Sequence, residues 1–217
     1  MNEIKRVNYD LVMQKIATES MGKSLLLHAC CAPCSSSVLK RLIPFFNLTI
    51  FYYNPNIDTE KEYQKRGCEL ERLINIYNEK LLPKKPIKLI LNPYNSEDFK
   101  RIAKGFETCH EGGARCVRCY KMRLLATYER AKQNGFAFFC STLSVSPHKK
   151  VEIINQIGSS IVQNDTASKN ESFFPMYLPN DFKKRNGYLD SINMSKELGL
   201  YRQDYCGCAF SKQHGID

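Results

Sequence analysis

Short apolar runs alternate with longer amphipathic stretches along most of the chain. The apolar runs have the length of buried strands, whereas the longer stretches repeat apolar residues at helical spacing. Strands that alternate with helices form parallel βαβ units, because each helix carries the chain back across the sheet. We therefore expect an open α/β fold in which helices cover both faces of a mostly parallel sheet, as a three-layer sandwich.

The expected elements end where the regular alternation weakens, at about residue 164. The serines that begin the first helix after a strand are expected to cap it. We predict a single α/β domain over residues 1–217, with an N-terminal extension at 1–22 and a C-terminal tail at 164–217 that packs on the sheet. The predicted strands are 24–29, 48–53, 87–92 and 136–143, with 173–178 as a weaker candidate, and the predicted helices are 34–42, 62–80, 96–105, 116–135 and 151–163.

The charge and the hydropathy narrow the class of protein. The chain has 32 Lys and Arg against 22 Asp and Glu, a formal net charge of +10, which favours a nucleic-acid partner over a merely soluble basic surface. No stretch approaches the roughly 20 apolar residues that cross a bilayer, and the first residues lack the apolar core of a signal peptide. We expect a cytoplasmic protein without a membrane partner, in a compartment that keeps thiols reduced.

Ten cysteines in such a chain favour metal binding or redox chemistry over disulfide scaffolding. Cys30 and Cys31 follow a predicted strand, at the carboxyl end where open α/β sheets bind ligands. Cys116 and Cys119 begin a predicted helix and share one face of it. Four such thiolates suit a [4Fe–4S] cluster or a zinc ion. The side chains of neighbouring residues point apart in an extended chain, which favours the larger cluster.

The other cysteines receive separate predictions. Cys34 is a candidate ligand of a second metal, iron or zinc, or a shielded thiol. Cys206 and Cys208 flank a glycine, and a disulfide across one residue is strained and easily reduced, so we favour a redox-active pair over two metal ligands. Cys68 is expected to be incidental on a helix, and Cys140 is expected to be a packed core residue. Cys109 lies in a loop close to Cys116 and is the weaker candidate of the two as a metal ligand.

Polar and aromatic residues near the predicted strand ends and in the tail are candidate substrate contacts. A segment after the fourth strand offers groups that hold phosphate or donate a proton, although an ordinary solvated helix start has the same composition. Basic and aromatic residues interleaved in the tail fit phosphate contact with base stacking, against the alternative of a charged surface. The candidates are His148 as a proton donor, Ser146 and Lys149 after the strand, Lys183, Lys184, Tyr201, Arg202 and Tyr205 in the tail, and Tyr53 and Asn54 at another strand end.

The motifs occur in one order between residues 24 and 211: LLLHACCAPCSSSVLKRL, FYYNPNIDTEKEYQKR, RCVRCYKMRL, STLSVSPHKK, DFKKRNGY and SKELGLYRQDYCGC. In this order they resemble the cobalamin-independent epoxyqueuosine reductases of bacterial tRNA modification. The resemblance implies a Rossmann-like sheet and the last step of queuosine synthesis, in which the epoxide on a modified anticodon-loop base of tRNA is reduced to an alkene and its oxygen leaves as water.

The resemblance also implies roles for the cysteines. The family's paired cysteines match Cys30 and Cys31 and its CxxC matches Cys116 and Cys119, so these four would hold a [4Fe–4S] cluster, without cobalamin. Its terminal CxC matches Cys206 and Cys208, which would act as the redox pair and draw electrons from a donor that the sequence leaves unidentified.

Two other functions fit parts of the pattern. An ATP-dependent tRNA thiolation enzyme has a similar sheet, but it needs a glycine-rich loop after the first strand, and residues 28–37 read HACCAPCSSS with no glycine. A non-catalytic RNA-binding module that contains zinc would account for the charge and for part of the cysteine pattern. Zinc without iron or sulfide would distinguish that module from a reductase.

Overall fold

The computed structural model describes residues 7–81, 83–167 and 173–212. Its centre is a sheet of five strands in the order β3-β2-β1-β4-β5, and every neighbouring pair is parallel. This confirms the predicted α/β class. The strands are β1 (Ser24–His28), β2 (Asn47–Tyr52), β3 (Lys88–Leu91), β4 (Phe138–Ser141) and β5 (Met176–Tyr177).

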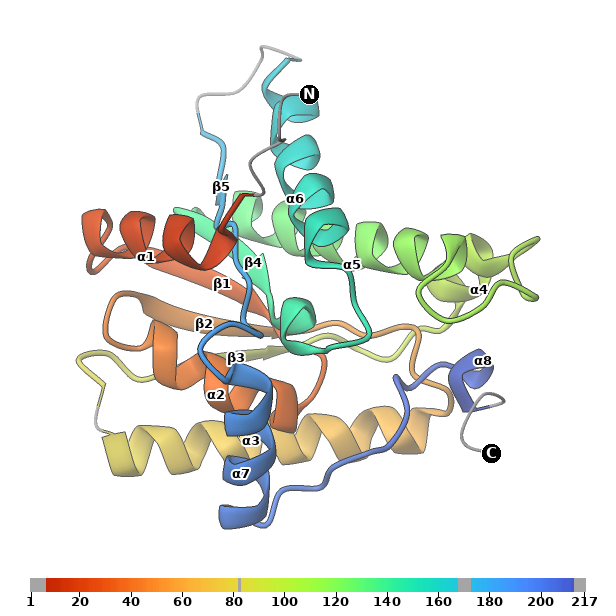
Figure 1. Cartoon of the computed structure of the whole chain (residues 1–217), viewed down its shortest axis with the longest axis horizontal. Helices are drawn as coiled ribbons and strands as arrows, with labels where there is room; N and C mark the ends of the chain where they lie inside the picture. The colour runs from red at the N-terminus through yellow and green to blue at the C-terminus, as the bar shows by residue number, and fades with distance from the viewer. Residues whose placement is uncertain (1–6, 82, 168–172, 213–217) are drawn as a thin grey trace, which may run out of the picture.

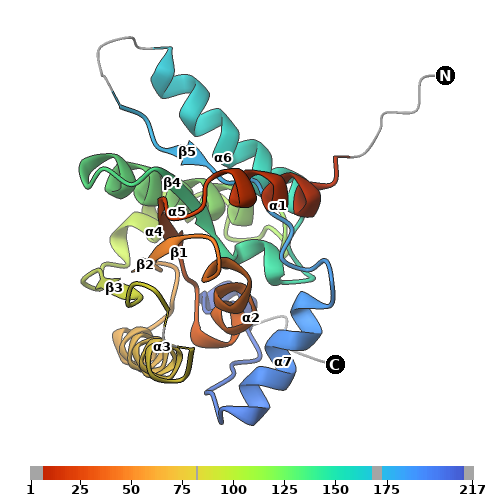
Figure 2. The same ribbon diagram turned by 90° about the vertical axis from the view of Figure 1, so that its left-hand side faces the viewer.

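Helices cover both faces of the sheet and make the three layers that the sequence predicts (Figures 1 and 2). One layer holds α2, α3 and α7, and the other holds α5 and α6 with α4 beside α5. The helices are α1 (Tyr9–Glu19), α2 (Ala32–Leu42), α3 (Glu60–Leu81), α4 (Glu97–Ala103), α5 (Ala114–Gln133), α6 (Val151–Thr166), α7 (Gly187–Glu197) and α8 (Ala209–Lys212), with the 3-10 helix η1 (Thr142–Val145) directly after β4.

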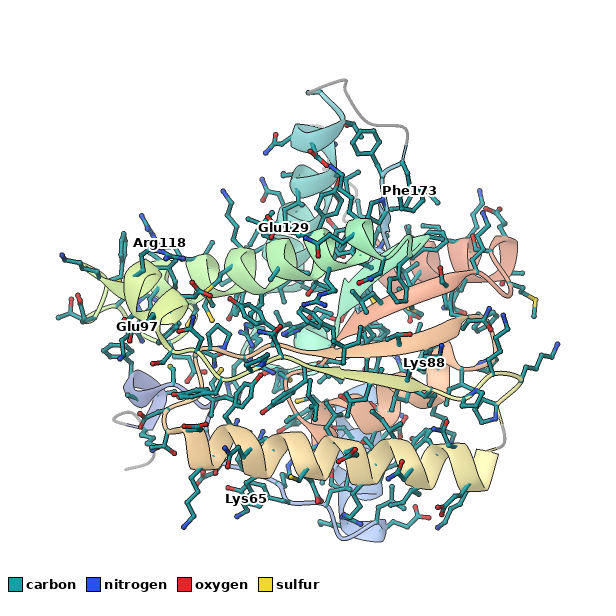
Figure 3. All side chains as sticks on the ribbon, turned by 180° about the vertical axis from the view of Figure 1, so that it is seen from behind. Lys65, Lys88, Glu97, Arg118, Glu129 and Phe173 are labelled. Atoms are coloured by element: carbon teal, nitrogen blue, oxygen red, sulfur yellow. The ribbon has the colours of Figure 1, made fainter. Side chains whose placement is uncertain are left out.

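The central strand β1 explains why the sheet is so apolar. Leu25, Leu26 and Leu27 are all fully buried, because β1 pairs with β2 on one side and β4 on the other while helices cover both faces. A strand buried on both faces reads as a continuous apolar run instead of an alternating one. In Figure 3, where the molecule is seen from behind, Lys65 marks the end of the molecule near the carboxyl ends of the strands and Lys88 marks the opposite end.

The segment that was predicted as an N-terminal extension contains a helix, α1. Asn8 caps it by accepting a hydrogen bond from the backbone N–H of Leu11. The helix buries only a narrow stripe, with Met13 and Ala17 in the core, while Leu11 stays exposed. An apolar stripe this narrow does not stand out from a polar sequence, so the periodicity did not reveal the helix.

The serines of α2 are inside the helix instead of capping it. Cys31 occupies the N-cap position in an extended conformation and makes no side-chain capping bond. Ser35 Oγ donates to the carbonyl oxygen of Cys31 at 2.8 Å, and Ser37 Oγ donates to the carbonyl oxygen of Gly187 at 2.8 Å. The small side chain of Ser37 lets α7 approach α2 closely. Gly187, at the start of α7, is also close to the preceding segment, where a Cβ on it would lie only 1.9 Å from the carbonyl oxygen of Phe182.

The tail returns to the sheet edge, as the sequence predicts. After α7 the chain runs along α3 to α8, near the carboxyl ends of the strands (Figure 1). Arg72 donates to the carbonyl oxygens of Leu198 and Gly199, and the backbone N–H of Asp58 donates to the carbonyl oxygen of Gly207 at 2.7 Å. None of the helices in the described ranges combines the length and the apolar content that crossing a bilayer requires.

Candidate metal and redox site

A cavity of about 670 Å³ opens at the carboxyl edge of the sheet. The loop after β1, the η1–α6 segment, α3, α5 and the tail all contribute to its wall, so segments that are distant in sequence meet here. The lining residues that carry sulfur or a fixed positive charge are Cys30, Cys31, Cys34, Cys206, Arg66, Arg123, Lys149, Arg202 and Lys212.

Cys30, Cys31 and Cys34 form a compact thiol triad whose sulfur atoms all lie within 4.8 Å of one another. The Sγ atoms of Cys30 and Cys31 are 3.8 Å apart. The expectation that adjacent thiols point apart is therefore wrong at this site, because the chain turns from β1 into α2 between them and brings both sulfurs to one side. Three converging thiolates with an open position are a ligand group for a soft metal.

The triad places its first negative charge on Cys30. Hydrogen bonds from the thiols of Cys31 and Cys34 hold the pKa of Cys30 well below its usual range, and the positive charge of Lys149 adds to this effect. The same coupling raises the pKa of Cys31 to about 12 and raises the pKa of Cys34. The three thiols thus influence one another's protonation, and the thiolate is favoured at Cys30.

Cys116 and Cys119 lie on the first turns of α5, as the spacing predicts. Burial raises the pKa of Cys119 to about 12, and nearby Cys206 and Cys208 contribute to the rise. Cys119 and Cys208 also share a small buried apolar cluster with Phe99. The structure therefore brings the CxxC of α5 next to the CxC of the tail. Within the described part of the chain, the triad is the only group of three or more Cys, His, Asp or Glu side chains with ligand atoms within 4.8 Å, so neither Cys116 nor Cys119 belongs to such a group.

Two arginines that the sequence analysis missed line the cavity with buried side chains. Arg123 is 1% exposed and Arg66 is 2% exposed, and Nη2 of each has no hydrogen-bond partner among the described residues. Arg66 Nε donates to Glu62 at 2.7 Å, but Arg123 has no carboxylate partner in the described ranges. A sequence signal for Arg123 did exist, because it lies four positions after Cys119 on the same face of α5.

Lys149 adds a further positive charge at the cavity wall. Burial opposes this charge, but the neighbouring Cys206, Cys30 and Cys34 outweigh burial and raise the pKa of Lys149. Cations that are buried without carboxylates call for a compensating anion. The thiol groups and the orphaned Nη2 atoms therefore fit a centre that carries net negative charge, as a thiolate-ligated metal or an iron–sulfur cluster does.

The two tail cysteines lie on opposite sides of the cavity wall. Cys206 is half-buried and lines the cavity, whereas Cys208 is 6% exposed and faces the apolar cluster. Gly207 between them has a φ of 111°, which side chains rarely allow, and a Cβ there would lie 2.9 Å from Arg66 Nη1. All ten cysteines are free thiols in this structure.

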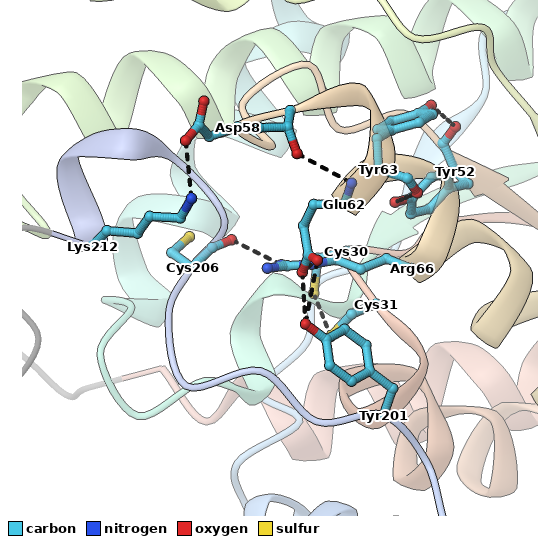
Figure 4. Close-up of polar contacts among 11 residues, drawn as sticks. Cys30, Cys31, Tyr52, Asp58, Glu62, Tyr63, Arg66, Tyr201, Cys206 and Lys212 are labelled. Carbon is cyan, nitrogen blue, oxygen red and sulfur yellow. Dashed lines mark hydrogen bonds and ion pairs between the residues drawn. The ribbon is translucent and has the colours of Figure 1, made fainter.

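A latch holds the tail against α3 (Figure 4). The hydroxyl of Tyr201 donates to the carboxylate of Glu62, and Lys65 Nζ lies 3.5 Å from the centroid of the Tyr201 ring. Lys65 thus covers the ring of Tyr201 in this structure, and the stacking of a base on Tyr201 stays a prediction. Tyr205 does line the cavity, with the guanidinium of Arg66 5.0 Å from its ring centroid.

Tyr53 and Asn54 lie below the cavity and do not line it. The Tyr53 hydroxyl donates to Asp98 at 2.8 Å, and Asn54 donates to the carbonyl oxygen of Ala29 at 2.9 Å while it accepts from Arg123. Both side chains are buried. Both side chains therefore support residues around the cavity in this structure, and their contact with substrate stays a prediction.

The remaining candidates lie at the mouth of the cavity and in an adjoining one. Ser146, His148 and Arg202 line the main cavity, with Ser146 half-buried and His148 exposed. A second cavity of about 560 Å³ shares His148 and Lys149 with the first and is lined also by Lys183 and Lys184. We call the basic side chains of these two adjoining cavities the basic path; Glu152 and Asp181 also line the second cavity.

The three cysteines outside these groups occupy ordinary positions. Cys140 is fully buried in β4, as expected for core packing, and Cys68 is exposed on α3. Cys109 is half-buried in the loop before α5 and belongs to no close ligand group in the described part of the chain.

Comparison with a solved structure gives only a distant likeness. The U34-tRNA thiolase NcsA from Methanococcus maripaludis, solved with its [4Fe–4S] cluster, has a TM-score of 0.46 and 12% sequence identity, with 93% of this chain and 69% of that chain covered. At this level of similarity the likeness assigns no chemistry to this chain.

Comparison of sequences gives a close family match. The sequence profile of the family described as "Epoxyqueuosine reductase QueH" matches residues 25–214. The protein of that name from Streptococcus pyogenes is 37% identical over 222 residues, covering 100% of this chain and 83% of the relative. The one from Staphylococcus epidermidis is 38% identical over 220 residues, covering 98% and 88%, and the one from Thermotoga maritima is 31% identical over 191 residues, covering 87% and 90%. With the profile spanning the sheet, the thiol triad and the tail cysteines, this chain belongs to the QueH family of epoxyqueuosine reductases.

Proposed function

We propose that this chain reduces epoxyqueuosine in tRNA to queuosine, in the cytoplasm. The observation that carries the proposal is the convergence of the thiol triad and Cys206 on one cavity at the carboxyl edge of the sheet. The family match over residues 25–214 names the reaction of the relatives, and the cavity supplies a place for reducing groups beside a substrate.

The proposed cofactor is a [4Fe–4S] cluster held by Cys30, Cys31, Cys116 and Cys119. A cluster spreads its ligands over several irons, so the four thiols do not need the close spacing of a single-ion site. Cys34 then remains available as a ligand of a second metal, iron or zinc. The buried guanidinium of Arg123, whose Nη2 has no hydrogen-bond partner among the described residues, and the half-buried Lys149 at the cavity wall support an anionic centre here. When bound, the cluster supplies electrons one at a time.

The redox balance assigns a role to the tail pair. Removal of the epoxide oxygen as water consumes two electrons and two protons and leaves an alkene. Oxidation of the thiols of Cys206 and Cys208 to a disulfide releases two electrons and two protons, which matches that demand. An external donor of electrons then reduces the disulfide again. The imidazole of His148 or the hydroxyl of Tyr205, both at the cavity wall, is positioned to deliver a proton to the departing oxygen.

The basic path leading from the cavity is the proposed contact for the tRNA backbone. Lys184 is exposed at the second cavity, whereas Lys183 Nζ donates to the carbonyl oxygen of Lys149 at 2.9 Å and so orients that loop. Phosphates along this path would hold the anticodon loop while the target base is splayed into the 670 Å³ cavity beside Arg202 and Tyr205.

Anaerobic purification with iron and sulfide quantitation, followed by an epoxyqueuosine-tRNA reduction assay, tests the proposal. Cys31→Ser and Cys116→Ser should lose cluster absorbance and turnover together, and Cys208→Ser should keep the cluster but lose turnover. Cys68→Ser, an exposed cysteine outside the site, is the matched control and should keep both. Turnover in a cluster-free variant would refute the mechanism. Zinc without iron or sulfide in the wild-type protein would favour the non-catalytic RNA-binding module.

A further inference from the structure

Arg123 carries a buried positive charge that the rest of the described chain does not neutralise. Its side chain is 1% exposed on α5, where Nε donates to the carbonyl oxygen of Cys119 at 3.4 Å and Nη1 donates to Asn54 Oδ1 at 3.3 Å. These partners are neutral, and Nη2 has none among the described residues. Placing a cation in such surroundings is costly unless an anion accompanies it.

The contrast with Arg66 shows what Arg123 lacks. Arg66 is equally buried at the same cavity, but Glu62 lies 2.7 Å from its Nε and balances its charge. Arg115 is also buried without a carboxylate partner among the described residues, but it donates to the carbonyl oxygens of Phe106 and Glu107 and does not line the cavity. The groups that favour the charged form of Arg123 are instead thiols from three separate segments, namely Cys119, Cys206 and Cys30. Arg123 thus contacts the backbone of the CxxC at Cys119 and lines the same cavity as the triad and Cys206.

Hydrogen bonds hold the guanidinium of Arg123 in place near the loop that carries Cys30. Asn54, which accepts from Arg123, donates in turn to the carbonyl oxygen of Ala29, directly before Cys30. His28 hydrogen-bonds to Ser141 Oγ and to the carbonyl oxygen of Tyr53 in the same layer. The side chains of Asn54, His28 and Ser141 in this network carry no permanent charge, so the guanidinium of Arg123 is the only permanently charged group among these described residues.

We propose that Arg123 is a positioning residue whose buried charge balances the anionic thiol-bound centre and favours its reduced form. The inference rests on the proposed iron–sulfur cofactor. Each electron that enters such a centre adds one negative charge, and a fixed cation nearby stabilises the product of reduction more than the oxidised form. Removal of the charge should make reduction harder.

A redox titration of the anaerobically purified holoenzyme, monitored by cluster absorbance and electron paramagnetic resonance, measures this effect. Arg123→Met removes the charge and keeps much of the side-chain volume, whereas Arg123→Lys keeps the charge. Arg41→Met is the control, because Arg41 is half-buried but lies beside Arg185 and Asp190, away from the cysteines. Iron and sulfide content and the thermal unfolding midpoint are measured for each variant.

At a fixed ambient potential, the ratio of reduced to oxidised cluster should fall at least about tenfold in Arg123→Met, which is about 59 mV for a one-electron couple. Arg123→Lys and Arg41→Met should stay close to the wild-type ratio. Arg123→Met could lose the cluster. In that case the charge requirement is supported if Arg123→Lys keeps both the cluster and the wild-type potential.

Three outcomes would overturn the inference. An unchanged potential in a cluster-loaded Arg123→Met protein removes the electrostatic role while leaving the proposed function intact. Loss of the cluster from both Arg123 variants shows that the shape of the guanidinium matters instead of its charge. A wild-type protein that holds no iron and sulfide removes the proposed cofactor itself, and the inference with it, so the two failures are distinguishable.

Discussion

The main chain of Gly207 lies against the guanidinium of Arg66, so closely that a Cβ at Gly207 would be 2.9 Å from Nη1 and 3.1 Å from Cγ1 of Ile57. The tail cysteines on either side of Gly207 therefore approach α3 only because this residue has no side chain.

Gly207→Ala should displace the cysteine pair and lower the rate of epoxide reduction at least tenfold. The φ of 111° costs about 1–3 kcal/mol for a residue with a Cβ, and the contact with Arg66 adds to this cost. Cluster content should be unaffected, because no proposed cluster ligand moves. Gly199→Ala is the matched control: its φ is also positive, at 57°, but nothing lies within 4 Å of the added Cβ. Equal activity loss in both variants would show that backbone strain alone is responsible.

The contact between Glu69 and the tail should depend on pH. The hydrogen bond from Arg72, together with the one from the backbone N–H of Tyr201 at 2.7 Å, lowers the pKa of Glu69 below its ordinary value of 4.5. A carboxyl with a lowered pKa stabilises the folded contact at pH values above 4.5, and this contribution is lost as the pH falls through the lowered pKa.

Hydrogen exchange of the peptide containing Tyr201, corrected for the intrinsic rate at each pH, measures this contact. Protection should be constant from pH 7 to 5 and then decrease. In Glu69→Gln it should be roughly tenfold lower at pH 7, as expected when a hydrogen bond to a charged group worth about 1.5 kcal/mol is lost. Glu71→Gln, an exposed neighbour on α3, should behave like wild type. If Glu69→Gln keeps the protection of the wild-type protein, the charge of the Glu69 carboxylate does not stabilise the contact with the backbone of Tyr201.

Neutralising Lys184 should weaken tRNA binding and make the binding less dependent on salt concentration. A side chain that contacts one phosphate contributes about 0.7 to the slope of log K against log salt for single-stranded nucleic acid. Lys184→Gln should reduce that slope by about this amount in a binding titration from low to moderate salt. Lys88→Gln is the control, since Lys88 is exposed at the far end of the sheet (Figure 3). An equal loss of slope in both variants would indicate a non-specific effect of net charge.

Substitution by serine should lower the free energy of unfolding at Cys140 and leave it nearly unchanged at Cys68. Cys140→Ser places a hydroxyl in the fully buried interior of β4 and should destabilise the fold by about 1–3 kcal/mol. Cys68→Ser changes an exposed side chain and should alter stability by less than about 0.5 kcal/mol. Urea denaturation of the two variants compares them directly. A stable Cys140→Ser protein would show that the interior of β4 offers the hydroxyl a hydrogen-bond partner.

The sheet was predictable because its signal is local. The apolar run at Leu25–Leu27 marks a doubly buried strand wherever it occurs, and the cysteines that follow it lie at a ligand-binding edge by the rule of parallel sheets. The helix α1 was not predictable, because its two buried apolar residues, Met13 and Ala17, are too few to form a visible period.

The details of the site depend on tertiary contacts that no spacing rule contains. The 3.8 Å separation of the Cys30 and Cys31 sulfurs arises from the turn into α2, and the rule for extended chains predicted the opposite. The sequence predicts that Tyr201 stacks on a base, but it does not reveal that the Tyr201 hydroxyl donates to Glu62 and that Lys65 lies over the Tyr201 ring. Arg123 was missed because an arginine on a helix is ordinarily a surface residue, and only the fold shows that it is buried.

The position of the cysteine pair on the tail has a consequence for how the protein is made. During translation the five strands and the thiol triad precede residues 198–212, so a nascent chain can assemble its sheet while the pocket above Arg66 has no cover. The tail is thus the last part of the pocket wall to be synthesised, and the wall is complete only when Gly207 reaches α3.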